Sequence, residues 1–157
     1  MLEKICKAEL SDLQDIAALE SEIFSGAWSL KSLEETWNQK NAVIFAAKTE
    51  EKIAGYLIIY YVLDEGEIAR IATAPSMRRQ GAAGQMFQEL VAFCEEQQIT
   101  RIMLEVRGGN EAARRFYEKC GFVRFYKIPN FFTDNYDHPI YEGGVQLIDM
   151  VYLQRHI

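Results

Sequence analysis

Residues 74–93 read APSMRRQGAAGQMFQELVAF and change character halfway along. A proline and two arginines precede the small residues Gly81 to Gly84, after which the pattern becomes that of an amphipathic helix. Small residues let backbone N–H groups approach a ligand closely, and the first four N–H groups of a helix have no partner within it. The helix dipole and the side chains of Arg78 and Arg79 add positive charge. The pattern therefore indicates a phosphate-type anion site, although a Gly-rich loop with two solvated arginines is the alternative.

Apolar runs on both sides of this stretch predict strands, four before it and three after it. They cover residues 3–8, 41–49, 52–63, 65–74, 99–106, 122–128 and 144–153. The stretch between the last two strands, residues 129–144, is polar and contains proline and glycine, which is typical of a loop.

Helical spacing of apolar residues predicts four helices, roughly over residues 13–23, 30–37, 82–94 and 111–120. The first helix carries Glu20 on the same face as Leu13, Ile16 and Ile23. Gly121 follows the last helix in the position of a C-cap glycine. Strands in hairpin order, followed by strands that alternate with helices, predict a mixed α/β sheet with helices on both faces.

The composition suits one globular domain, residues 1–157, with a core of its own. The net charge of −6 argues against a nucleic-acid partner. Three cysteines without CxxC spacing argue against disulfide and zinc frameworks. Two histidines without metal-ligand spacing lead us to expect no metal. The charged N-terminus and the lack of a long apolar run predict a cytoplasmic protein with no membrane partner.

The loop matches the pattern [QR]-x-x-G-x-[GA] at Arg78, Gly81 and Ala83, whereas the P-loop and GxGxxG patterns are absent from it. The wider sequence VLDEGEIARIATAPSMRRQGAAGQMFQEL, followed by ITRIMLEVRGGNEAARRFYEKCGF, resembles the core of the GNAT (Gcn5-related) N-acetyltransferase family. It is most similar to the ribosomal-protein-alanine N-acetyltransferases, which carry LEVR, N, A, LYE and GF at the same spacing. The resemblance covers about residues 5–128 and implies the GNAT fold, with a mostly antiparallel central sheet.

The resemblance also implies that acetyl-CoA is the acetyl donor. The strand residues would pair their backbone with the pantetheine arm, the loop amides would hold the pyrophosphate, and an asparagine would reach the arm near its thioester. The cofactor-binding residues implied in this way are Ile71, Ala72, Thr73, Arg78, Arg79, Gln80, Gly81, Ala82, Ala83, Gly84 and Asn110. Asn110 also has the sequence position of a helix N-cap.

Two residues have the catalytic roles in this family pattern. Glu105 is the one acidic residue in an apolar strand, so we expect burial to raise its pKa and to suit it as the base for the attacking amine, directly or through water. A structural ion pair with Arg70, Arg101 or Arg107 is the alternative. Tyr117 corresponds to the acid that protonates the departing CoA sulfur; otherwise it is one of the apolar residues on its helix.

The identity of the acceptor amine stays open, because the segment 129–144 is longer than in the family pattern and has Phe131 and Phe132 in place of tyrosines. One hypothesis is acetylation of a protein N-terminal α-amine, with a ribosomal protein as the family precedent. A second is acetylation of a small amine such as a polyamine, an amino acid or an aminoglycoside. A third is a non-catalytic acyl-CoA-binding module, against which the presence of Glu105 and Tyr117 argues.

Overall fold

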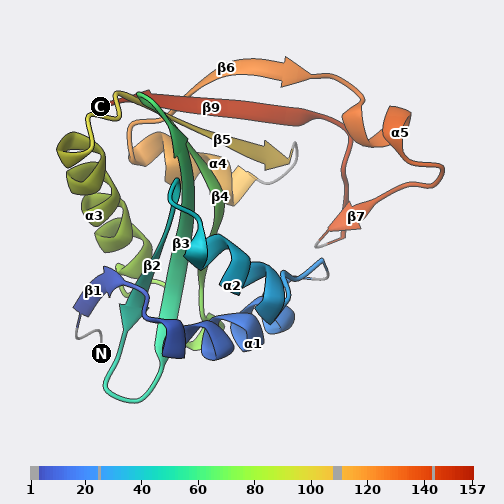
Figure 1. Ribbon diagram of the computed structural model, residues 1–157. Coiled ribbons are helices and arrows are strands. Elements are labelled where there is room, and N and C mark those ends of the chain that lie inside the picture. Colours follow the sequence, from blue (N-terminus) through green and yellow to red (C-terminus); the bar gives the residue numbers. More distant parts are fainter. Residues whose placement is uncertain (1–3, 25, 108–110, 143) are drawn as a thin grey trace. The chain divides into compact units, whose positions relative to one another are not determined.

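The computed structural model describes residues 4–24, 26–107, 111–142 and 144–157, which Figure 1 shows as ribbons. The chain divides into two compact units, Met1–Thr100 and Arg101–Ile157, called the N-terminal unit and the C-terminal unit below. Both combine antiparallel strands with helices, which confirms the predicted mixed α/β class.

The N-terminal unit contains four antiparallel strands in the order β1-β2-β3-β4. Long apolar runs form these strands, and every residue of β3 from Ile53 to Ile59 is buried. The strands are β1 (Lys4–Lys7), β2 (Ala42–Lys48), β3 (Ile53–Val62) and β4 (Glu65–Thr73). The helical elements are η1 (Leu10–Asp12), α1 (Leu13–Ile23), α2 (Leu30–Asn38), η2 (Pro75–Met77) and α3 (Ala82–Glu96).

Helices cover both faces of this four-stranded sheet. Phe45 of β2 contacts Phe93 of α3, with ring centroids 5.7 Å apart. Tyr56 of β3 instead reaches Glu20 of α1. Tyr56 lies directly opposite Ala46, the residue after Phe45, and successive strand residues point to opposite faces. The predicted arrangement of helices on both faces is therefore confirmed within this unit.

The C-terminal unit contains three antiparallel strands in the order β5-β9-β6 and a separate β7–β8 hairpin. Its strands are β5 (Arg101–Arg107), β6 (Val123–Ile128), β7 (Tyr141–Glu142), β8 (Val145–Gln146) and β9 (Met150–His156). Its helices are α4 (Glu111–Lys119) and α5 (Phe131–Asn135). Gly121 follows α4 with φ +93°, a left-handed conformation that favours glycine, which confirms the predicted C-cap.

The predictions for the last part of the chain were wrong in two respects. The expected strand over residues 144–153 is interrupted, and β9 begins only at Met150. Residues 129–144 are not merely a polar loop, because they contain α5 and one strand of the β7–β8 hairpin. The cause is a local cluster in which Phe132, Leu147 and Met150 are buried. Polar residues interrupt the apolar pattern in this part of the chain, so its periodicity did not reveal the cluster.

Candidate functional site

The loop before α3 has the geometry of an anion site. Two of its residues have left-handed backbone, Arg79 with φ +66° and Gly81 with φ +82°, so the chain turns sharply into the helix. The first bond of α3 runs from the Gln85 amide to the Gly81 carbonyl, and no side chain caps the helix. The amides of residues 82–84 therefore have no partner within α3 and are suited to anionic oxygens.

Cations lie in this loop and against the η2 helix before it. Arg78 and Arg79 are exposed, and Nε of Arg78 donates to the Thr73 carbonyl at 3.4 Å, at the end of β4. Nζ of Lys52, in the turn between β2 and β3, donates to Oγ of Ser76 at 2.8 Å. Lys52 was not among the residues that the sequence pointed to, because only the pairing of β3 with β4 brings it beside η2. Arg78 and Arg79 in the loop, and Lys52 against the preceding η2, add positive charge to this part of the chain, which favours an anionic group such as phosphate.

The strand that leads into the loop carries a β-bulge. Ile58 of β3 lies opposite Arg70 and the next residue, Ile59, lies opposite Ile68, so Ala69 has no residue across from it. Bulges bend a strand and are frequent beside active sites. Beyond the bulge, Ile71, Ala72 and Thr73 continue the ladder with β3 in regular register.

Glu105 lies on β5, but the expectation that it is buried was wrong. The buried residues of β5 are Ile102, Leu104 and Val106, and strand alternation puts Glu105 on the other face, where it is exposed. Its carboxylate makes no ion pair or hydrogen bond with any residue that the structure describes. The alternative of a structural ion pair with Arg70 is also wrong, because Arg70 pairs with Glu20. An unpaired, accessible carboxylate is available as a proton acceptor.

Tyr117 lies on α4 with its ring against two aromatic neighbours. Its ring centroid is 5.6 Å from that of Phe116 and 6.0 Å from that of Phe122. Burial raises the pKa of Tyr117 to about 12, with a smaller contribution from Cys120. The phenol consequently keeps its proton at neutral pH, as a hydrogen-bond donor or acid must. Asn110, the remaining predicted site residue, lies outside the described residues.

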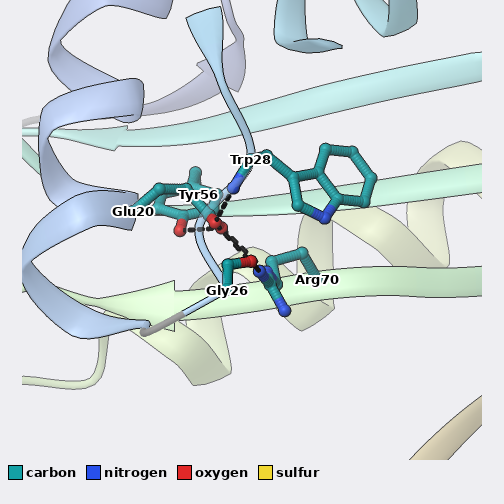
Figure 2. Close-up of polar contacts among 5 residues, drawn as sticks. All are labelled: Glu20, Gly26, Trp28, Tyr56 and Arg70. Atoms are coloured by element: carbon teal, nitrogen blue, oxygen red, sulfur yellow. Dashed lines mark hydrogen bonds and ion pairs between the residues drawn. The ribbon is translucent and has the colours of Figure 1, made fainter.

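A buried polar cluster, absent from the predicted site, connects α1 to β4 and is drawn in Figure 2. The Glu20 side chain is fully buried, and its carboxylate accepts two bonds from Arg70, from Nε at 2.8 Å and from Nη2 at 3.0 Å. The Tyr56 hydroxyl donates to it at 2.5 Å and the Trp28 amide at 2.9 Å. Burial and the bond to Glu20 raise the pKa of Tyr56, so this hydroxyl also stays protonated.

The sequence did contain a signal for this cluster. Glu20 falls on the apolar face of α1, and a carboxylate in that position must find a partner because an unpaired buried charge is very costly. The partner could not be read from the pattern, since Arg70 is 50 residues away along the chain.

Neither a metal-binding cluster nor a membrane-spanning helix is present in the described part of the chain. No group of three or more His, Cys, Asp and Glu side chains in it is arranged to hold a metal ion. None of its helices combines the length and the hydropathy needed to cross a bilayer.

Known proteins resemble this chain in sequence and in structure. The model of the acetyltransferase (GNAT) family matches residues 13–122. The ribosomal protein bS18-alanine N-acetyltransferase of Escherichia coli K12 is 30% identical over 118 residues, which cover 75% of this chain and 79% of that protein. The crystal structure of the ribosomal-protein-S18-alanine N-acetyltransferase from Escherichia coli has a TM-score of 0.84 at 25% identity, covering 100% of this chain and 94% of that one. A Bacillus subtilis acetyltransferase solved in complex with CoA has a TM-score of 0.77 at 22% identity, covering 100% of this chain and 99% of that one.

Proposed function

Because the chain belongs to the GNAT family of acetyltransferases, we propose that it transfers the acetyl group of acetyl-CoA to the N-terminal α-amine of a protein. The observation that carries this proposal is the sequence similarity to the bS18-alanine N-acetyltransferase of Escherichia coli. The acceptor that fits best is accordingly the N-terminal alanine of a ribosomal protein. Ribosomal proteins are made in the cytoplasm, so this acceptor also supports a cytoplasmic location. The family model spans parts of both units, which supports a single acetyltransferase domain over residues 1–157.

The donor would bind along β4 and the loop that follows it. The free amides at the start of α3, together with Gln80 and Gly81, would hold the pyrophosphate, and the backbone of residues 71–73 would pair with the pantetheine arm. Arg78 and Arg79 would add positive charge, and Asn110 would reach the arm near its thioester. The left-handed backbone at Arg79 and Gly81 supports this role, since it turns the chain so that the α3 amides remain without internal partners.

The chemistry would use two residues of the C-terminal unit. The lone pair of the neutral amine forms the N–C bond at the thioester carbonyl, and the C–S bond then breaks. Glu105 takes the proton that the amine loses, directly or through a water molecule. Tyr117 donates its phenolic proton to the sulfur of the departing CoA. The exposed, unpaired carboxylate and the protonated phenol support these two roles.

The acceptor is tested with a panel of amines. We expect a short peptide with a free N-terminal alanine to release CoA thiol and to gain an acetyl group at its α-amine, measured by a thiol assay and mass spectrometry. The same peptide with a blocked N-terminus is the control and should give no turnover. Turnover only with polyamines, amino acids or aminoglycosides would replace the protein acceptor with a small amine. Tight CoA binding without turnover on any amine would indicate a non-catalytic acyl-CoA-binding module.

The donor site is tested at Gly81. Gly81→Val places a β-branched residue at φ +82°, which must distort the loop, so we expect the affinity for CoA to fall at least about tenfold. Gly144 is a matched control, because its φ is +81° and an added Cβ there would meet no atom within 4 Å. Gly144→Val should carry a similar backbone strain and leave CoA affinity unchanged in calorimetry. Arg79→Ala should only weaken binding, and unchanged affinity in Gly81→Val would refute the loop assignment.

A further inference from the structure

The Glu20 cluster holds the connection between α1 and α2 against β4. Besides its bonds to Glu20, Nη2 of Arg70 donates to the Gly26 carbonyl at 3.0 Å. The guanidinium carbon lies 4.0 Å from the centroid of the Phe24 ring and 5.8 Å from that of Trp28, within the range of cation–π contacts. One arginine thus contacts Phe24, Gly26 and Trp28, and Figure 2 shows its bond to Gly26.

This connection has no regular secondary structure at Gly26 and Trp28, so its conformation depends on these contacts. The Glu20 carboxylate binds the Trp28 amide directly and Gly26 through Arg70, and its side chain is fully buried. The Arg70 side chain is 17% exposed. A bidentate arginine–carboxylate pair of this kind fixes geometry more closely than a single charge contact does. The segment is accordingly held by the ion pair.

The position of Arg70 along β4 decides where this segment lies relative to the donor. The proposed pyrophosphate loop follows the C-terminal end of β4, so the pantetheine arm would run back along the strand from Thr73 to Ile71. Its thioester end would then come to the level of Arg70, next to the bulge at Ala69. The amine must approach this end of the arm. Arg70 therefore ties Phe24, Gly26 and Trp28 to the part of β4 beside which the acceptor would react.

We infer that Glu20 and Arg70 are positioning residues that fix Phe24, Gly26 and Trp28 as one wall of the acceptor site. The inference rests on the proposed acetyl transfer. Neither side chain would touch the reacting atoms; their ion pair determines the conformation of the wall. A pair that served only the stability of the fold would lack this selective effect on the acceptor.

The test compares kinetic constants for the two substrates in Arg70→Lys. Lysine keeps the charge but cannot make the paired bonds to Glu20 together with the bond to Gly26. We expect the KM for the acceptor to rise by about tenfold to a hundredfold, the order of effect of a misplaced positioning group. The affinity for CoA, measured by calorimetry, should stay within about twofold of the wild-type value, because a positioning role at the acceptor wall leaves the donor contacts intact.

Lys48→Met is the matched control. It removes another ion pair of the N-terminal unit, in which Lys48 Nζ lies 2.7 Å from Asp12 Oδ2 and the two side chains are 14% and 13% exposed. Both substrate constants should be unchanged in this variant. Phe24→Leu is the second test variant, since it removes the ring that faces the guanidinium and leaves the ion pair in place; it too should raise the acceptor KM selectively, even if Arg70→Lys does not fold.

The outcomes separate this inference from the proposed function. A wild-type protein that acetylates no amine overturns the proposed function and the inference with it. If the wild type is active, an unchanged acceptor KM in folded Arg70→Lys or Phe24→Leu overturns the inference alone. A fall in CoA affinity as large as the rise in acceptor KM would also overturn it, and so would an equal rise of acceptor KM in Lys48→Met. In either case the effect would be one of general stability.

Discussion

Replacing Tyr117 with phenylalanine is expected to lower kcat by about 10²–10⁴-fold, the range typical of a lost general acid. The substitution removes one hydroxyl and keeps the ring that packs against Phe116 and Phe122, so the free energy of unfolding should change little. Steady-state kinetics and thermal unfolding measure the two effects. Tyr126→Phe, at a 57% exposed position of the same unit, is the control and should leave both quantities unchanged. Near-normal turnover in folded Tyr117→Phe would return this residue to a packing role.

The raised pKa of Tyr117 also predicts the shape of the alkaline pH profile. Its ordinary value is about 10, and in the folded protein burial raises the pKa to about 12. The phenol therefore stays protonated as the pH rises past its ordinary value, and it loses its proton only near the folded pKa. We therefore expect that loss of the Tyr117 proton causes no fall in kcat between pH 8 and pH 10. A rate profile of the wild-type protein against pH checks this.

Replacing Glu105 with glutamine is expected to lower kcat/KM at neutral pH, by about 10²–10⁴-fold if the carboxylate is the base. Glutamine preserves the shape of the side chain but cannot accept the proton. Because Glu105 is exposed and unpaired among the described residues, stability should stay within about 0.5 kcal/mol of the wild type. CoA affinity should be retained. Glu89→Gln, an exposed carboxylate of α3, is the control that should have normal kinetics.

The dependence of this loss on pH separates a base from a positioning group. An α-amine has an ordinary pKa of about 7.7–8.0, so above that range solution already supplies the neutral amine. Part of the activity lost in Glu105→Gln should therefore return as the pH rises above about 8. A loss that stays constant across the pH range would indicate that Glu105 positions the substrate and does not take its proton.

Local sequence patterns were sufficient to predict the loop of the proposed donor site. The small residues from Gly81 to Gly84, the arginines before them and the helical spacing after them are near neighbours in sequence. The structure gives α3 its start at Ala82 and gives Gly81 the left-handed backbone that a glycine permits. Strand and helix periodicity likewise assigned Glu105 to a strand and Tyr117 to a helix. These features depend on interactions within a few residues, which a sequence displays directly.

The amino-acid sequence by itself therefore determined the α/β class, the loop that opens α3 and the elements that carry Glu105 and Tyr117. Only the tertiary structure decided that Glu105 is exposed, because an apolar run does not say which face of a strand is covered. It also decided that Glu20 pairs with Arg70, since this pairing needs α1 to pack on the face of β3 and β4 that carries Tyr56 and Arg70. Contacts across 50 residues depend on strand register and on packing, and neither is encoded in the spacing of neighbouring residues.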